Sequence, residues 1–209
     1  LRYLSTTQEV VMRAETRTHR QEQIEVAAYK LLEQKGFAGT SMQGIARLAK
    51  ASNETLYNWY GDKQGLFKAL VARNADEVKS LLEEELDAQR DALGILGLLG
   101  PRLLSLLLGP RAIALNRAAA ADPTGALGQA LSQAGRESVA PLLVQVLERA
   151  KAAGQLSFEL SDQAVALYLD LLVGDLQIRR VIGVLPPPDD AFCQERSERA
   201  TRMLVKLLG

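Results

Sequence analysis

Apolar residues recur along most of this chain at the three- and four-residue spacing of an amphipathic helix, and no run alternates as a half-buried strand would. That spacing predicts an all-α fold. One segment, 161–183, is apolar almost all round, so we expect it at the centre of a core or against a partner. With the Gly and Pro stops, the pattern predicts helices near 18–35, 41–48, 52–58, 62–88, 91–108, 110–120, 125–152, 161–183 and 189–208.

Residues 40–60 predict two short helices joined by a tight turn. Thr40 opens a Thr-x-x-Gln capping box for the first helix, and Ser52 is the expected N-cap residue of the second. Leu56 and Trp59 are expected on the inner side of the second helix. Its outer side presents hydrogen-bonding side chains that can reach base edges and phosphates: Asn53, Thr55, Tyr57 and Asn58. The unit looks like a DNA-reading helix-turn-helix, although paired short helices are also common in proteins that bind no DNA.

The charge of the whole chain gives no evidence about DNA binding, but the charges of its segments differ. The 209 residues carry no net charge, so bulk electrostatics gives no argument for nucleic-acid binding. Residues 1–65 hold nine Lys/Arg against seven Asp/Glu, whereas residues 66–93 hold four against seven. A mildly basic N-terminal region can bind DNA through a few placed contacts and helix N-termini.

Hydrophobic residues make up 47% of the chain, which allows a sizeable core in one ordinary domain or two small ones. Cys193 is the single cysteine, so no intrachain disulfide can form and a reducing, cytoplasmic location is expected. Charged residues interrupt every long apolar run, and the first 20 residues lack the apolar segment of a secretory signal. We therefore expect no membrane partner.

The sequence predicts no catalytic site, no metal and no cofactor. His19 is the only histidine, so neither a Cys–His pair nor a histidine-carboxylate metal cluster can be placed. No Gly-rich phosphate loop appears either. An enzyme of the small helical kind is therefore disfavoured.

The region from about Gln23 to Val71 resembles the TetR family of transcriptional regulators. The run Glu54 to Lys63 is similar to the AefR-like branch, and the segments at Arg111–Leu115 and Gly174–Leu176 look like that branch more weakly. The positions that agree in order and spacing are Ile24, Ala27, Ala28, Leu31, Gly36, Phe37, Thr40, Ser41, Ile45, Ala46, Ala49, Ser52, Thr55, Leu56, Tyr57, Trp59, Tyr60, Lys63, Leu66 and Phe67.

The residues themselves predict a polar arm at 1–17. The resemblance implies a three-helix DNA-binding domain at 18–65 and a helical ligand-binding and dimerisation domain at 66–209. Asn53, Thr55 and Asn58 are then candidates for base contacts, while Tyr57 and Lys63 match residues that the family aims at phosphates. Glu54 and Lys50 depart from the small residues that the family often places there, which leaves the operator sequence open. The candidate DNA-binding residues are Thr40, Ser41, Ser52, Asn53, Thr55, Tyr57, Asn58, Tyr60 and Lys63.

The resemblance further implies a homodimer, double-stranded operator DNA as partner, and a small apolar or amphipathic effector bound in the C-terminal body. The candidate cavity residues, for which simple core packing is the alternative, are Leu103, Leu107, Asn116, Tyr168, Leu172 and Asp175. The candidate dimer-interface residues, on the last two helices, are Leu167, Leu171, Val181, Leu204 and Leu208. The expected function is a ligand-responsive repressor; the alternative is a helical adaptor, or a regulator that lacks a small-molecule effector.

Overall fold

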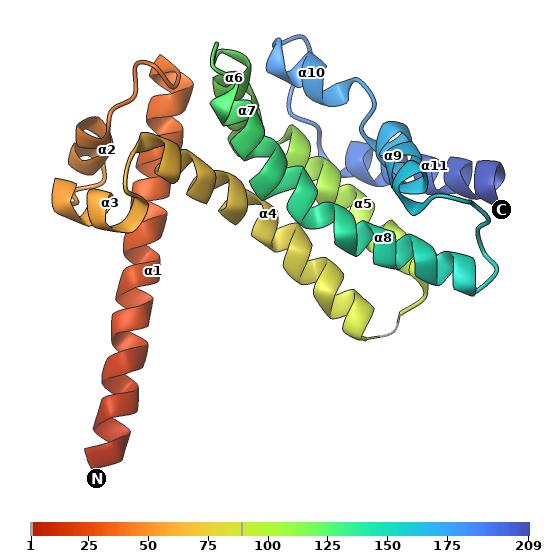
Figure 1. The fold of residues 1–209 in the computed structure, drawn as a ribbon, viewed down its shortest axis with the longest axis horizontal. Coiled ribbons are helices and arrows are strands. Elements are labelled where there is room, and N and C mark those ends of the chain that lie inside the picture. The colour runs from red at the N-terminus through yellow and green to blue at the C-terminus, as the bar shows by residue number, and fades with distance from the viewer. Residues whose placement is uncertain (1, 89) are drawn as a thin grey trace. The chain divides into compact units, whose positions relative to one another are not determined.

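The computed structural model describes the backbone of residues 2–88 and 90–209, and side chains within 17–88 and 90–209. These residues form helices and connecting turns without a strand, which confirms the all-α prediction. The elements are α1 Arg2–Lys35, α2 Met42–Leu48, α3 Asn53–Tyr60, α4 Lys63–Asp87, α5 Ala92–Leu108, α6 Pro110–Ala120, α7 Ala126–Leu131, a π-helical turn Ser132–Arg136, α8 Glu137–Ala152, α9 Ser161–Leu172, α10 Leu176–Val181 and α11 Asp190–Leu208 (Figure 1).

The chain divides into two compact units, residues 1–70 and 71–209. In the first unit α2 packs against both α1 and α3 (Figure 1). Buried residues from all three helices form its interior, among them Ile24, Ile45 and Leu56, each at most 1% exposed. The start of α4 closes this interior with Leu66 and Phe67. A small helical interior of this kind fixes the direction in which α3 presents its outer face.

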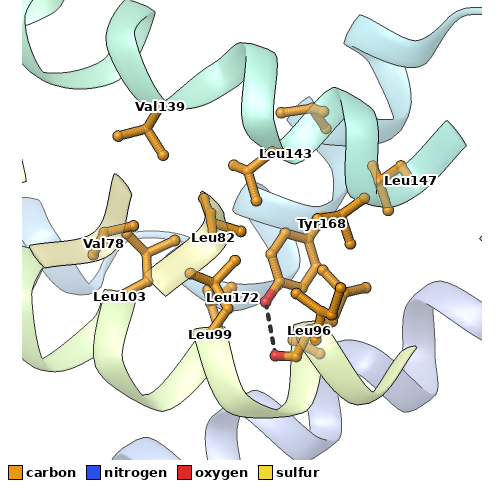
Figure 2. Packing of buried hydrophobic residues seen from close by; sticks show 14 of the residues in the cluster. Val78, Leu82, Leu96, Leu99, Leu103, Val139, Leu143, Leu147, Tyr168 and Leu172 are labelled. Carbon is orange, nitrogen blue, oxygen red and sulfur yellow. Dashed lines mark hydrogen bonds between the residues drawn. The ribbon is translucent and has the colours of Figure 1, made fainter. Parts of the chain in front are cut away.

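The second unit is built around α5, which contacts α6, α8, α10 and α11. Tyr168 of α9 is fully buried there, and its hydroxyl donates to the Leu96 carbonyl at 3.4 Å (Figure 2). Burial raises the pKa of the Tyr168 hydroxyl above its usual value because the charged form is poorly solvated. Leucine and valine side chains from α4, α5 and α8 belong to the same buried cluster as this ring (Figure 2).

Three of the predicted helix boundaries are wrong. The first helix was expected to begin at residue 18, but α1 runs unbroken from Arg2, because residues 2–17 contain neither Gly nor Pro. The segment 125–152 is not one helix, since a π-helical turn separates α7 from α8. The segment 161–183 is likewise two helices, because Gly174 adopts φ +51° between α9 and α10.

No single helix in the part of the chain that the structure describes is long and apolar enough to span a membrane. The helices α5 and α6 pass that length and composition test only as a pair, which is bent by 53°.

Candidate nucleic-acid interface and effector cavity

The first helix of the predicted pair is capped one residue later than expected. Ser41 is the N-cap residue of α2, and its Oγ accepts a hydrogen bond from the Gly44 amide at 3.1 Å. Thr40 is instead 4% exposed, and its hydroxyl donates to the Gly36 carbonyl at 2.7 Å. The capping box at Thr40 was therefore wrong, because that hydroxyl closes the turn after α1. Of Thr40 and Ser41, only Ser41 is exposed at the start of α2.

The second helix begins as predicted. Ser52 is the N-cap residue of α3, and its Oγ accepts from the Thr55 amide at 3.0 Å. The Ser52 and Thr55 hydroxyls also lie 2.8 Å apart and share a hydrogen bond. A rigid cap of this type stabilises a short helix by about 1 kcal/mol, and here it holds the N-terminal end of α3 in one position.

The outer face of α3 is polar and accessible. Asn53, Tyr57 and Asn58 are exposed, with 53% of Tyr57 accessible, whereas Leu56 on the inner face is fully buried. One face of this eight-residue helix therefore packs against the interior of the first unit, and the opposite face is open to solvent. Two carboxamides and a phenol on one exposed helix are suited to hydrogen-bonding bases and phosphates.

The end of α3 carries an aromatic pair that contacts α1. Trp59 and Tyr60 are both partly exposed, and their ring centroids lie 6.4 Å apart in an edge-to-face arrangement. The guanidinium of Arg17, on α1, lies 5.5 Å from the Trp59 ring centroid. Trp59 is therefore not wholly a core residue, and a cation from α1 stands next to the candidate reading helix. Sequence spacing gave no signal for this pairing, because 42 positions separate the two residues.

Lys63 is held inside the first unit. Its Nζ donates to the carbonyls of Phe37 at 2.8 Å and Thr40 at 3.0 Å, and it lies 4.2 Å from the centroid of the Phe37 ring. Two of the three ammonium N–H groups are thereby used within the protein, and the side chain is half-buried. Lys63 thus ties the start of α4 to the α1–α2 turn, and its third N–H group makes no hydrogen bond among the described residues.

Two surface hollows adjoin α2. One, of about 360 Å³, includes Gln43, Arg47 and Asn53 in its lining, so it joins the exposed faces of α2 and α3. The other, of about 440 Å³, has four cationic side chains around it, which are Lys30, Lys35, Arg47 and Lys50. Gln43 and Arg47 were not among the predicted site residues. Their exposed positions opposite the buried Ile45 and Ala46 were the signal that could have found them.

A larger cavity, of about 450 Å³, lies in the second unit. Residues from α4, α5, α6, α7, α8, α9 and α10 and from the π-helical turn line it. Its volume falls within the range of small-molecule sites, roughly 300–1,000 Å³. The π-helical turn contributes Ser132, Gly135 and Arg136 to the wall, and such turns often mark functional positions.

Three of the six predicted cavity residues line the cavity and three do not. Leu103, Leu107 and Asn116 line the cavity. Tyr168 and Leu172 do not, because both are fully buried in the core cluster. Asp175 is also outside the lining: it is exposed, immediately before α10, with a carboxylate oxygen 4.0 Å from Arg179. The polar character of Asp175 within an apolar run marked a helix start and not a pocket.

The predicted dimer-interface residues differ in how deeply they are buried. Leu204 is fully buried within its own chain, so its side chain cannot meet a partner. The others are partly buried: Leu167, Leu171, Val181 and Leu208. On α11, Met203 and Leu207 are exposed by 37% and 55%, and their four-residue spacing puts them on one face that sequence reasoning missed.

Comparison with known proteins matches both parts of the chain. The family model described as bacterial regulatory proteins, tetR family, matches residues 24–70. The model described as AefR-like transcriptional repressor, C-terminal domain, matches residues 95–207. The second match alone covers more than half of the chain.

A curated relative, the uncharacterized HTH-type transcriptional regulator YvkB of Bacillus subtilis (strain 168), is 37% identical over 70 residues. That match covers 33% of this chain and 37% of the relative.

Solved structures show the same fold. A putative TetR-family transcriptional regulator from Mesorhizobium loti MAFF303099 is similar with a TM-score of 0.75 and 22% identity, over 92% of this chain and 98% of that one. The transcriptional regulator FadR from Bacillus subtilis, solved in complex with stearoyl-CoA, has a TM-score of 0.67 and 17% identity, over 88% and 97%.

The capped α2–α3 pair lies where the tetR family model matches, and the cavity-bearing helices from α5 onward lie where the AefR-like model matches. This chain belongs to the TetR family of DNA-binding transcriptional regulators, and its C-terminal part is of the AefR-like type.

Proposed function

We propose that this chain is a homodimeric repressor that reads operator DNA with α3 and leaves the DNA when a small apolar or amphipathic effector binds its second unit. The observation that carries the DNA-binding half is the outer face of α3. A short helix with a hydrogen-bonded N-cap and a buried inner residue, Leu56, presents Asn53, Tyr57 and Asn58 to solvent.

In this proposal Asn53 and Asn58 contact base edges in the major groove, where a carboxamide can pair with adenine in two hydrogen bonds. Tyr57 and Ser41 contact phosphates, which position the helix without reading sequence. Thr40 acts through the backbone turn that its buried hydroxyl stabilises, and not by touching DNA.

The mildly basic surface of the first unit supports these contacts. Arg47 and Lys50 lie beside the hollows that adjoin α2, and Lys30 and Lys35 extend the same positive surface. Cations arranged around a hollow next to a reading helix add affinity for the phosphate backbone that depends on salt concentration.

The dimer is supported by the exposed apolar residues of the last helices. Met203 and Leu207 are exposed on α11, Leu167 and Leu171 are partly buried on α9, and these two helices contact each other. A two-fold interface on these helices would bring two reading helices to one DNA molecule, with half-sites about 34 Å apart or near a multiple of it.

The effector site is the cavity of about 450 Å³ in the second unit. The related fold of the Bacillus subtilis FadR structure holds stearoyl-CoA, which supports a ligand-binding role for this part of the fold. An effector that prefers a conformation unable to bind operator would weaken DNA binding, typically by 1–3 kcal/mol of coupling.

The test is selection of bound fragments from genomic DNA by the full chain. We expect one enriched near-palindrome, because a two-fold dimer presents two copies of α3. The test variant is Asn58→Ala on α3. The matched control is Gln129→Ala, which removes an exposed carboxamide from α7. The first variant should enrich the motif more weakly and without preference at one base pair of each half-site, and the second should enrich it as the unmodified chain does. Enrichment of no motif by the unmodified chain would contradict the proposal and favour a helical adaptor.

A further inference from the structure

The cavity in the second unit is apolar on its inner side. Val78 of α4, Leu103 of α5 and Val139 and Leu143 of α8 line it, and all four are buried in the core cluster. Figure 2 shows Val139 pointing toward the side of the cluster where Val78 and Leu103 lie. A ligand that enters must therefore bury an apolar part against this wall, because a polar part would lose hydrogen bonds to water there.

Two carboxamides in the lining have fixed orientations. The Nδ2 of Asn116 donates to the Ala112 carbonyl at 2.9 Å, and the Nε2 of Gln177 donates to the Leu107 carbonyl at 3.2 Å. Each bond determines which end of the amide faces the helix backbone, so the oxygens Oδ1 and Oε1 face elsewhere. Among the described residues no hydrogen bond reaches either oxygen, and both side chains are only partly buried. The lining thus offers two oriented hydrogen-bond acceptors.

The charges in the lining balance. Arg136 is the one cationic side chain among the described residues that line the cavity, and Asp170 is the one carboxylate. Both are exposed, so they lie on the solvent side of the cavity. Ser132 gives its hydroxyl proton to Glu137 Oε1 at 2.8 Å, and the other polar side chain among the described lining residues is the carboxamide of Asn74. A ligand with several phosphates would need several cations here, and a single arginine in a lining that also holds a carboxylate does not supply them.

We propose that the effector is an uncharged apolar molecule with a hydroxyl group that donates to Asn116 Oδ1 or Gln177 Oε1, as an alkylphenol would, and that it is not an acyl-CoA. This rests on the proposed role of the cavity as the effector site. A phenol with a pKa near 10 keeps its proton at pH 7 and so remains a neutral donor. Its alkyl chain would pack against the wall formed by Val78, Leu103 and Val139.

The test is titration calorimetry of the full chain, without DNA, against four probes: 4-butylphenol, its methyl ether 4-butylanisole, decanoate and lauroyl-CoA. The phenol and the ether share the ring and the alkyl chain and differ in the donated proton. We expect the phenol to bind about three- to tenfold more tightly than the ether, the range of one neutral hydrogen bond. Decanoate and lauroyl-CoA should bind more weakly than the phenol.

Substitutions of Asn116 and Gln177 test whether these two acceptors cause the preference for the phenol over its ether. Gln177→Met and Asn116→Leu each remove one acceptor and keep side-chain volume similar. At least one of them should reduce the preference for phenol over ether to about onefold, while the affinity for the ether stays the same. The matched control is Gln145→Met, an exposed glutamine of α8 outside the cavity, which should keep the preference.

Equal affinity for phenol and ether, tighter binding of lauroyl-CoA, or no binding of any probe would each overturn the inference, and none of these needs a folded variant. Retention of the preference in both acceptor variants would overturn it as well. The DNA selection described above is independent of these results, because it uses the chain without any probe. A failed ligand class with an enriched operator would leave the DNA-binding proposal intact.

Discussion

Gly100 of α5 lies close to Ser197 of α11, and adding one methyl group there should destabilise the second unit. A Cβ at this position would lie 2.0 Å from Ser197 Oγ, 2.8 Å from Ser197 Cβ and 3.2 Å from the Tyr168 hydroxyl. Ser197 and Tyr168 are both fully buried, so neither can swing into solvent. The perturbation is therefore Gly100→Ala.

The expected magnitude follows from two opposing effects. Alanine favours a helix interior over glycine by about 1 kcal/mol, but overpacking a close-packed core costs about 1–3 kcal/mol or more. The 2.8 Å approach to a Cβ atom cannot be relieved by rotating a side chain. We expect a net loss of about 1–3 kcal/mol in the free energy of unfolding. Gly97→Ala is the matched control, since it lies in α5 with nothing within 4 Å of its added Cβ, and should gain up to about 1 kcal/mol.

The assay is urea denaturation followed by far-UV circular dichroism, at one protein concentration for all variants because the proposed dimer makes stability depend on concentration. Ser197→Ala tests the other side of the contact. Among the described residues Ser197 Oγ has no hydrogen-bond partner, so its removal should be neutral or stabilising and should partly rescue Gly100→Ala. If Gly100→Ala is as stable as Gly97→Ala, the close α5–α11 packing is wrong.

Three further changes test other parts of the account. Asp91→Ala removes the N-cap of α5 and should cost about 1 kcal/mol at pH 7. The hydrogen bond from the Gly94 amide, followed by that from Gln155, lowers the pKa of Asp91 in the folded chain, so this stabilisation is present above the unfolded pKa of about 3.9 and is lost as the pH falls through the folded pKa. Urea titrations at pH 7 and near pH 3 should therefore show a narrower gap between variant and unmodified chain at the lower pH; a constant gap would contradict the charged cap. Lys63→Ala should lower the unfolding free energy by about 1–2 kcal/mol, since its ammonium bonds two carbonyls, and should flatten the salt dependence of DNA binding by about one unit if its third N–H reaches a phosphate. Met203→Glu should shift the dimer toward monomer in light scattering, because it puts a charge on the exposed apolar face of α11; a monomer for the unmodified chain at micromolar concentration would refute the dimer itself.

Local signals were enough to predict the α2–α3 helix pair and the N-cap of its second helix. Ser52 at the start of α3 and the buried Leu56 followed from capping preference and helical spacing, because both are decided within one or two turns of helix. Thr40 and Ser41 show the limit of such signals. Both are good caps, and the choice between them depends on whether the Gly36 carbonyl is close enough to take the Thr40 hydroxyl.

Contacts between distant segments were beyond the reach of sequence patterns. The carbonyl partners of Lys63 lie 23 and 26 residues away, and Arg17 meets Trp59 only because α1 and α3 share one unit. The same limit explains the wrong prediction of Tyr168 as a cavity residue. The pattern of an apolar helix shows which residues avoid water, but it does not show whether they face a cavity or another side chain. Periodicity also missed the break at Gly174, since apolar residues continue on both sides of it.

The central claim is that the exposed face of α3 reads DNA sequence. The most direct measurement is fluorescence anisotropy of the selected operator duplex, and of duplexes with each base pair changed in turn, for the unmodified chain and for Asn58→Ala. The account predicts that Asn58→Ala loses about 1–3 kcal/mol on the operator and loses discrimination at one base pair of each half-site. Equal affinity of the two proteins for every duplex would contradict it and remove Asn58 from the reading surface.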